Sequence, residues 1–250
     1  MFEWGWVDLP QRVIAMWSGP RNISTALMRS WASRSDTTVI DEPFYAHYLQ
    51  FTGYDHPGAD EIIAAYETDW RRVIDGLVPD GSSDEKIVYQ KHMTQHMLDH
   101  IDRAWIARVS NCFLIRDPRR MLLSFSKVIP DPRLDQLGLV QQVQIFQHVR
   151  RVTGAVPPVI SSRGVLSDPE GSLRKLCALL NVPFESAMLR WQAGRHGSDG
   201  VWAKHWYASV EKSNGFAPYE RDDSPLPQHL RGLLNECQGL YEQMAKYCIN

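Results

Sequence analysis

Short runs of β-forming residues alternate with longer helical patterns along this chain. The runs are rich in branched and aromatic side chains, and helical spacing of apolar residues follows most of them. Helices between successive strands are typical of crossovers, which join parallel strands. The order therefore predicts an α/β protein, a three-layer α/β/α sandwich around a central parallel sheet. The expected strands are Val13–Trp17, Thr38–Ile40, Ile87–Gln90, Cys112–Ile115 and Pro158–Ser161.

The helical patterns are separated by short turns and not by linkers. The breaks at 79–85 and 130–133 are polar and indicate surface turns. A length of 250 residues suits one large α/β domain, so residues 1–250 are predicted to form a single domain. The expected helices are Ser24–Arg34, Ala59–Leu77, Met97–Trp105, Arg119–Lys127, Leu134–Val152, Pro169–Leu180, Phe184–Gln192 and Pro227–Tyr247.

Composition limits the partners of the chain. A net charge of −2 argues against bulk binding of nucleic acid, so any anion site must be local. The sequence contains neither an apolar stretch of about 18 residues nor a signal-peptide pattern at its start, which predicts no membrane contact. Four scattered cysteines without metal-ligand spacing predict buried thiols in a reducing, cytoplasmic setting and no metal site: Cys112, Cys177, Cys237 and Cys248.

The loop after the first strand has the features of an anion site. Ser18-Gly19-Pro20-Arg21-Asn22-Ile23 is turn-prone, and Ser24-Thr25 then begin a helix. Ser or Thr at this place is expected to cap the helix, and the N-terminal amides together with the helix dipole attract anions. The alternative is an ordinary capped helix after a strand.

The loop differs from an ATP-binding loop. The pattern G-x-x-x-x-G-K-[ST], counted from Gly19, requires Gly, Lys and Ser or Thr where the chain has Ser24, Thr25 and Ala26. The hydroxyl that would hold Mg²⁺ is therefore missing, which argues against ordinary nucleotide hydrolysis.

A second candidate phosphate site follows the fourth strand. Arg116 lies where Cys112–Ile115 ends, at the edge where open α/β sheets bind ligands. Ser124 follows eight residues later, about two helical turns along, so one phosphate could contact both side chains. The alternative is a strand–turn–helix with solvated arginines.

Three stretches resemble the cytosolic sulfotransferases. PRNISTAL (20–27) is similar to the loop of that family that binds the 5′-phosphosulfate of PAPS (3′-phosphoadenosine 5′-phosphosulfate). FLIRDPRRMLLSFSK (113–127) resembles the signature whose Arg and Ser hold the 3′-phosphate, and 159–184 resembles a third conserved strand–turn–helix. The resemblance is nearest to a bacterial sulfotransferase-like group. It implies a P-loop NTPase-like fold, PAPS as donor, PAP as product and no metal.

The resemblance also implies residue roles, with some departures. Gly19, Pro20, Arg21, Asn22, Ile23, Ser24 and Thr25 would bind the phosphosulfate, and Arg116 with Ser124 the 3′-phosphate. Arg21 replaces the usual Lys, Asn22-Ile23 replace Ser-Gly, and Ser161-Ser162 replace a Tyr-Glu pair. Ala26 stands where the animal enzymes have a Trp that stacks on adenine, so Trp202 or Trp206 would have to serve.

The acceptor side offers several candidate bases. Animal sulfotransferases have Lys-x-His at the end of the third strand, where this chain has Lys91, His92 and His96. Glu42 follows the second strand and resembles the glutamate base of some bacterial and Golgi enzymes. Glu42 and His96 rank about equal, with His92 behind. Aromatic residues available to wall an acceptor pocket are Tyr45, Tyr48, Trp202, Trp206 and Tyr207.

The resulting hypothesis is a sulfotransferase that moves a sulfuryl group from PAPS to a hydroxyl or amine of a small molecule. Glu42 or His96 would take the acceptor proton, while Arg21 and Lys91 stabilise the developing charge. A kinase with an aberrant loop and a non-catalytic nucleotide-binding protein are the alternatives. The sequence leaves a homodimer open.

Overall fold

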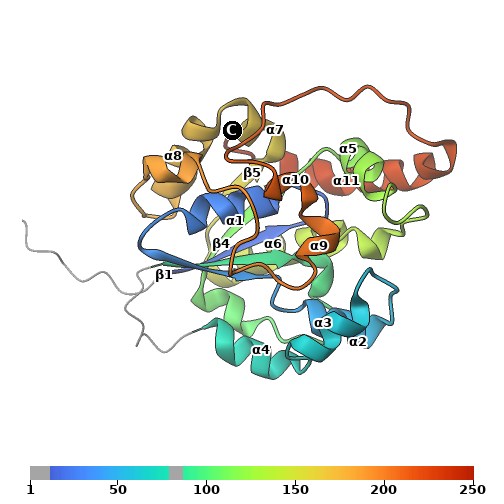
Figure 1. Ribbon diagram of the computed structural model, residues 1–250, viewed down its shortest axis with the longest axis horizontal. Coiled ribbons are helices and arrows are strands. Elements are labelled where there is room, and N and C mark those ends of the chain that lie inside the picture. Colours follow the sequence, from blue (N-terminus) through green and yellow to red (C-terminus); the bar gives the residue numbers. More distant parts are fainter. Residues whose placement is uncertain (1–11, 79–86) are drawn as a thin grey trace, which may run out of the picture.

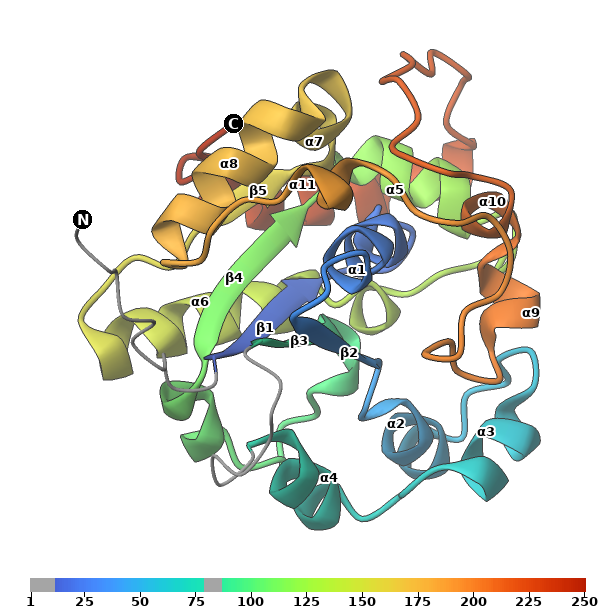
Figure 2. The same ribbon diagram turned by 60° about the vertical axis from the view of Figure 1, so that its left-hand side comes forward.

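Five parallel strands form one sheet in the order β2-β3-β1-β4-β5 (Figures 1 and 2). The computed structural model describes residues 12–78 and 87–250, so the turn expected at 79–85 lies outside the described residues. All five predicted strands are present, which confirms the predicted fold class, although the third continues three residues beyond its expected end: β1 (Arg12–Ser18), β2 (Thr37–Asp41), β3 (Ile87–Met93), β4 (Ser110–Ile115) and β5 (Val159–Ser161).

Side chains of the sheet alternate between two hydrophobic layers. Ile14 and Met16 of β1 face one layer, and Ala15 and Trp17 face the other. The first layer is covered by α1 (Ser24–Ala32), α2 (Tyr45–Thr52), α3 (Ala59–Ala65), α7 (Ser162–Ser167) and α8 (Pro169–Leu179). The second is covered by α4 (Trp70–Leu77), α6 (Leu139–Thr153) and α11 (Arg231–Ala245).

Four predicted helices are wrong in extent or kind. The helix expected over Leu134–Val152 is interrupted, because a 3₁₀ turn, Leu134–Gln136, is followed by Gly138 with a φ of 68°, and α6 begins only at Leu139. Two helices, α3 and α4, replace the single helix expected over Ala59–Leu77. The first ends because Tyr66 is extended, and the second begins after Asp69, which accepts a hydrogen bond from the backbone N–H of Arg71. Short 3₁₀ turns replace the helices expected over Met97–Trp105 and Phe184–Gln192. These turns are Thr94–His96, Ala104–Arg108 and Ser186–Leu189. Helical spacing of apolar residues therefore marked short turns here, two of which bury only one or two side chains each.

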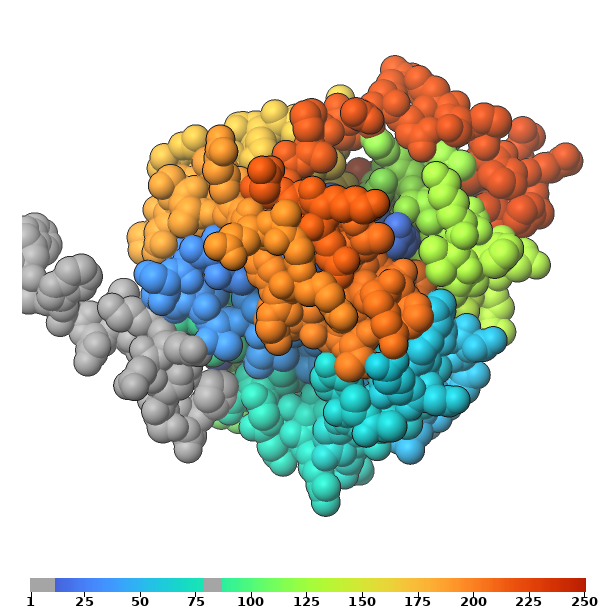
Figure 3. Space-filling view, in the orientation of Figure 1, coloured from blue at the N-terminus to red at the C-terminus, as the bar shows by residue number. Residues whose placement is uncertain are grey.

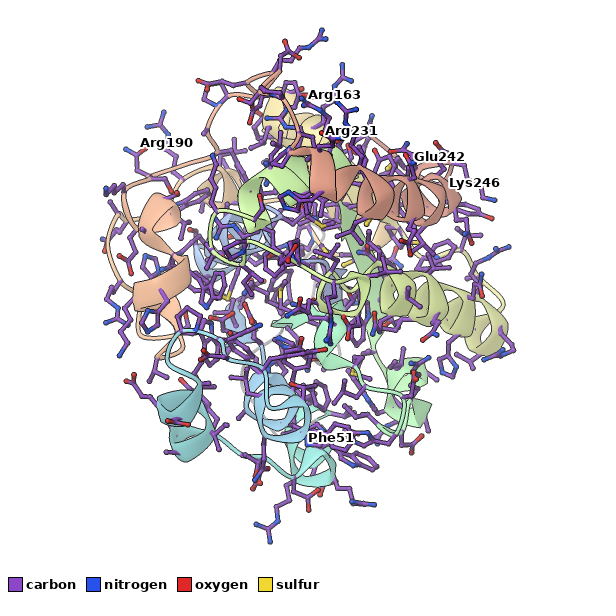
Figure 4. All side chains as sticks on the ribbon, turned by 90° about the vertical axis from the view of Figure 1, so that its right-hand side faces the viewer. Phe51, Arg163, Arg190, Arg231, Glu242 and Lys246 are labelled. Atoms are coloured by element: carbon purple, nitrogen blue, oxygen red, sulfur yellow. The ribbon has the colours of Figure 1, made fainter. Side chains whose placement is uncertain are left out.

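The last helix covers one edge of the second layer. Cys237 and Met244 of α11 are buried, while Arg231, Glu242 and Lys246 lie along its outer side (Figure 4). Phe51, on α2 at the opposite end of that view, is 64% exposed (Figure 4). All four cysteines are free thiols, and three of them are buried. Over the described ranges, the helices are too short or too polar to cross a bilayer.

The C-terminal segment, residues 190–227, has little regular structure, and part of it crosses the front of the molecule. It carries α9 (Ala203–Trp206) and α10 (Ala208–Glu211) and lies, in orange, over the blue β1–α1 region and against the cyan α3 (Figure 3). Asp199 in this segment pairs with Arg29 of α1 at 2.6 Å, and both side chains are at most 1% exposed. The segment is therefore anchored to the body of the fold by a buried ion pair.

Candidate active site

A cavity of about 370 Å³ lies where the strands reach their carboxyl ends. It is lined by the loop after β1, the first turn of α1, the ends of β2 and β3, α5 (Pro118–Phe125) and the C-terminal segment. Ser18, the last residue of β1, pairs with Met93 of β3 and Leu114 of β4, so these three strands end together. Open parallel sheets bind their ligands at this edge.

The loop after β1 is held against the sheet by its own side chains. Asn22 donates from Nδ2 to the carbonyl of Leu114 at 3.1 Å, and its Oδ1 accepts from the N–H of Ile23 at 3.0 Å. Arg21 has a φ of 52°, which is uncommon for a side chain with a Cβ and is typical of functional loops. Pro20 to Thr25 line the cavity as expected.

Gly19 has a packing role. It does not line the cavity, and a Cβ on it would lie 3.0 Å from the carbonyl oxygen of Leu137. Glycine therefore lets this loop approach the neighbouring chain closely.

The start of α1 differs from the expected cap. Ile23, not Ser24, is the N-cap residue, and its side chain caps nothing. The first turn of α1 contains no acidic residue, and Ser24, Thr25 and Ala26 line the cavity. The backbone N–H groups of this turn are consequently available to an anion.

The structure brings Arg116 and Ser124 to the same loop. Both line the cavity; Nη1 of Arg116 donates to the backbone carbonyl of Arg21, and Oγ of Ser124 accepts from Nε of Arg21 at 3.1 Å. Burial, together with the nearby Arg120 and Arg21, lowers the pKa of Arg116 to about 10. Burial also lowers the pKa of Arg21. Among the described residues no carboxylate pairs with Arg21 or Arg116, so the charge favours an anionic ligand.

A buried ion-pair cluster faces this anion site. Asp41 of β2 pairs in register with Lys91 of β3, and Nζ of Lys91 donates to Oδ1 of Asp41 at 2.9 Å. Lys91 Nζ also donates to Oε1 of Glu42 and to the hydroxyl of Tyr207, the latter at 2.8 Å. Lys91 is 1% exposed. All three N–H donors of the ammonium group are therefore used.

The backbone at Glu42 makes the double contact possible. Neighbouring residues on a strand point to opposite faces, yet both Asp41 and Glu42 reach the same ammonium group. Glu42 has a φ of 43°, while its N–H still bonds to the carbonyl of Lys91 at 2.9 Å. This left-handed turn directs the second carboxylate towards Lys91 and the cavity.

Charge and burial act differently on the members of the cluster. Burial, reinforced by Asp41, raises the pKa of Glu42 despite the opposing effect of Lys91. Burial alone would lower the pKa of Lys91, but the two carboxylates outweigh it and raise that pKa. Lys91 is thus a permanent cation, and Glu42 takes up a proton more readily than an ordinary glutamate.

The histidines separate into two environments. His96 lines the cavity, and its ring lies between Tyr45 and Tyr48, with centroids at 4.6 Å and 4.7 Å. Burial, followed by nearby basic groups, lowers its pKa well below 6.5. His92 points to the opposite face of β3, where it stacks on Trp17 at 4.4 Å. The structure therefore does not bring His92 to the cavity.

Residues 11–247 match the family described as "Sulfotransferase domain". The chain belongs to the sulfotransferase domain family. Two solved structures show the same fold. A sulfotransferase domain from the curacin biosynthetic pathway is 16% identical, with 95% of this chain and 99% of that one covered and a TM-score of 0.53. A sulfotransferase from Alicyclobacillus acidocaldarius is 13% identical, with 97% of this chain and 98% of that one covered and a TM-score of 0.55.

Two curated relatives from Arabidopsis thaliana are longer than this sulfotransferase chain. They are named branched-chain-amino-acid aminotransferase-like proteins 1 and 2. The first is 39% identical over 94% of this chain and 42% of its own length, and the second is 36% identical over 92% and 40%. The chain thus spans about two-fifths of the length of these relatives.

The aromatic side of the sulfotransferase cavity was only partly predicted. Tyr45, Trp206 and Tyr207 line it, whereas Tyr48 and Trp202 do not. Trp202 donates instead from Nε1 to the hydroxyl of Tyr207 at 3.0 Å, which leaves Trp206 as the adenine candidate of the two.

Sequence reasoning missed His56 and Asp41. Nδ1 of His56 lies 2.9 Å from the hydroxyl of Tyr45, and burial lowers its pKa to about 4. Asp41 could have been found from its place beside Glu42 at the end of a strand, opposite a lysine on the neighbouring strand.

Proposed function

We propose that this domain, as a single unit, transfers a sulfuryl group from PAPS to a hydroxyl or amine of a small-molecule acceptor. The observation that carries the proposal is that one cavity joins two unneutralised guanidinium groups, Arg21 and Arg116, with a carboxylate, Glu42. Free helix amides and Arg21 suit the phosphosulfate, and Arg116 with Ser124 suits the 3′-phosphate. The free thiols fit the reducing cytoplasm.

Glu42 is proposed as the base. Its hydrogen bonds from described residues end on Oε1, so Oε2 is left for the acceptor. The acceptor O–H or N–H proton passes to Glu42, the acceptor atom bonds to sulfur, and the bond from sulfur to the phosphate oxygen breaks in line. PAP leaves with the electron pair. A raised pKa makes Glu42 the stronger base, whereas the depressed pKa of His96 weakens it in this role.

Lys91, expected from the sequence to stabilise developing charge, is instead proposed to hold Glu42 in place. Its three donors are used by Asp41, Glu42 and Tyr207, so it holds the base and does not reach the sulfuryl group. Charge that develops on the sulfuryl oxygens is assigned to Arg21 and the first amides of α1. A sulfuryl group carries less charge than a phosphoryl group. In this proposal Arg21 and the α1 amides therefore stabilise the developing charge without a metal ion.

The direct test is incubation of the protein with ³⁵S-labelled PAPS and a metabolite extract, followed by a search for compounds that gain one SO₃. The Glu42→Gln variant is the matched control, because it preserves shape and removes the base. Turnover of ATP that requires Mg²⁺ would favour the kinase instead. Binding of PAP with no labelled product from any extract would favour a non-catalytic nucleotide-binding protein.

A further inference from the structure

The buried cluster around Lys91 contains two residues, Asp41 and Tyr207, that bind Lys91 and through it act on Glu42. We propose that Asp41 and Tyr207 are positioning residues. They hold Lys91 as a fixed cation, and they thereby keep Glu42 oriented and ready to accept a proton from its free oxygen. This inference rests on the proposed function only in naming Glu42 as the base.

Asp41 is the counter-ion that balances Lys91. Its Oδ1 lies 2.9 Å from Nζ of Lys91, and the two side chains are 2% and 1% exposed. A buried lysine with one carboxylate partner is neutral as a pair, so the second carboxylate, Glu42, is not needed for charge balance. Glu42 can therefore gain and lose a proton while the Asp41–Lys91 pair stays ionised.

Tyr207 completes the hydrogen bonding of that pair. Its oxygen accepts from Nζ of Lys91 at 2.8 Å and from Nε1 of Trp202 at 3.0 Å, and its O–H donates to Oδ2 of Asp41 at 2.7 Å. Burial and the two carboxylates raise the pKa of Tyr207 far above its usual range, so this hydroxyl stays a donor. The phenol consequently fixes the distance between Asp41 and Lys91.

Among the described residues, the groups that act most strongly on the Glu42 pKa are the members of this cluster, while Tyr45 and His96 line the same cavity. Asp41 comes from β2, Lys91 from β3 and Tyr207 from the C-terminal segment, while Tyr45 comes from α2. Tyr45 is neutral because burial, together with the charge of Glu42, raises its pKa. Removing the negative charge of Asp41 should therefore make Lys91 act on Glu42 alone.

The test is a direct titration of the Glu42 carboxyl by NMR in protein labelled with [δ-¹³C]glutamate. The Glu42 resonance is assigned by its loss in Glu42→Gln. In Asp41→Asn, which keeps the side-chain shape, the Glu42 pKa is expected to fall by about one unit, the scale of losing a neighbouring like charge. The matched control is Asp36→Asn, which removes the same charge next to the other end of β2.

Lys91→Gln serves as the second variant where Asp41→Asn does not fold. It removes the cation, so the Glu42 pKa is expected to rise. The proposal is overturned if the Glu42 pKa in the folded variant matches that of wild type, or if Asp36→Asn shifts it equally. Unchanged sulfotransferase turnover in Glu42→Gln would instead reject Glu42 as the base, and it would leave the titration result standing.

Discussion

Nε of Arg21 donates a hydrogen bond to Oγ of Ser124 at 3.1 Å, although 103 positions separate the two residues in the sequence. The bond joins the loop after β1 to α5. Arg116, in the turn between β4 and α5, bonds in turn to the backbone carbonyl of Arg21. The two phosphate motifs therefore form one continuous cationic surface, on which a ligand with two separated anionic groups can bind.

Arg116→Ala is expected to weaken PAP binding by about 2–4 kcal/mol, because a charge-assisted contact is lost and a phosphate is left unpaired. Adenosine 5′-phosphosulfate, which lacks the 3′-phosphate, should lose much less. Calorimetric titration of both ligands measures the difference. Arg119→Ala is the control, since Arg119 bonds to the carbonyl of Asp222 outside the cavity. Equal losses for the two ligands would remove the 3′-phosphate assignment.

Arg21→Ala is expected to lower kcat by about 10²–10³-fold, the usual effect of removing a donor that stabilises developing charge. Arg21→Lys should retain part of the activity, because it keeps the charge and loses the planar fork that reaches Ser124. Ser124→Ala removes that hydrogen bond, together with the proposed contact of Ser124 with the 3′-phosphate, and keeps the charge of Arg21. Single-turnover rates at saturating PAPS are the measurement, and an Arg21→Ala rate equal to wild type would exclude Arg21 from the reaction.

Glu42→Gln and His96→Asn distinguish the two candidate bases. Loss of the base should lower kcat by about 10²–10⁴-fold and leave PAP affinity nearly intact. We expect the large loss in Glu42→Gln. If His96→Asn shows it and Glu42→Gln does not, the base is His96.

The pH dependence of the wild-type enzyme follows from the raised pKa of Glu42. The carboxyl accepts a proton only above its pKa, so kcat/KM should rise with pH through a value above the ordinary 4.5 of glutamate. His96 would give a rise below 6.5, because burial lowers its pKa. The raised pKa of Glu42 and the lowered pKa of His96 move the two expected pH ranges towards each other. The rate–pH curve is therefore recorded on Glu42→Gln and on His96→Asn as well as on the wild type.

Removal of metal ions should leave activity unchanged. Ala26 occupies the place where an ATP-binding loop has the hydroxyl that holds Mg²⁺. Initial rates with EDTA and with added Mg²⁺ are expected to agree. A strict requirement for Mg²⁺ or Mn²⁺ would point to the kinase.

A pair of glycine variants tests the packing beside the cavity. Gly138 has a φ of 68°, and a Cβ there would lie 2.5 Å from Oγ1 of Thr94 and 2.7 Å from the backbone nitrogen of Gln95. Gly138→Ala should lower the free energy of unfolding by about 1–3 kcal/mol for the clash, in addition to the backbone strain. Gly53 has a φ of 65° and open space, so Gly53→Ala isolates the strain at about 1 kcal/mol. Urea unfolding compares the two, and equal losses would show that the contact with Thr94 relaxes freely.

The sheet and the positions of the two loop motifs could be predicted because their signals are local. A strand, a glycine and a helix start lie together in residues 13–26, and Arg116 and Ser124 are close in sequence. The position of each motif directly after a predicted strand indicated the carboxyl edge of the sheet, and the structure brings both motifs to one cavity there.

The acceptor side was less predictable because it depends on backbone detail and distant packing. The third strand was expected to end at Gln90 but continues to Met93, so His92 follows the strand alternation to the far face. The positive φ of Glu42 has no sequence signature, since glutamate rarely adopts it. Tyr207 reaches Asp41 across 166 positions, a contact that no local pattern indicates.

The hydrogen bond from Tyr207 to Asp41 connects the segment that borders the cavity with the buried ion pair of Asp41 and Lys91. Tyr207 belongs to the segment that borders the cavity, so lifting that segment removes a donor from Asp41 and an acceptor from Lys91. The hydrogen bonding around Glu42 therefore depends on a residue that lies 165 positions later in the chain.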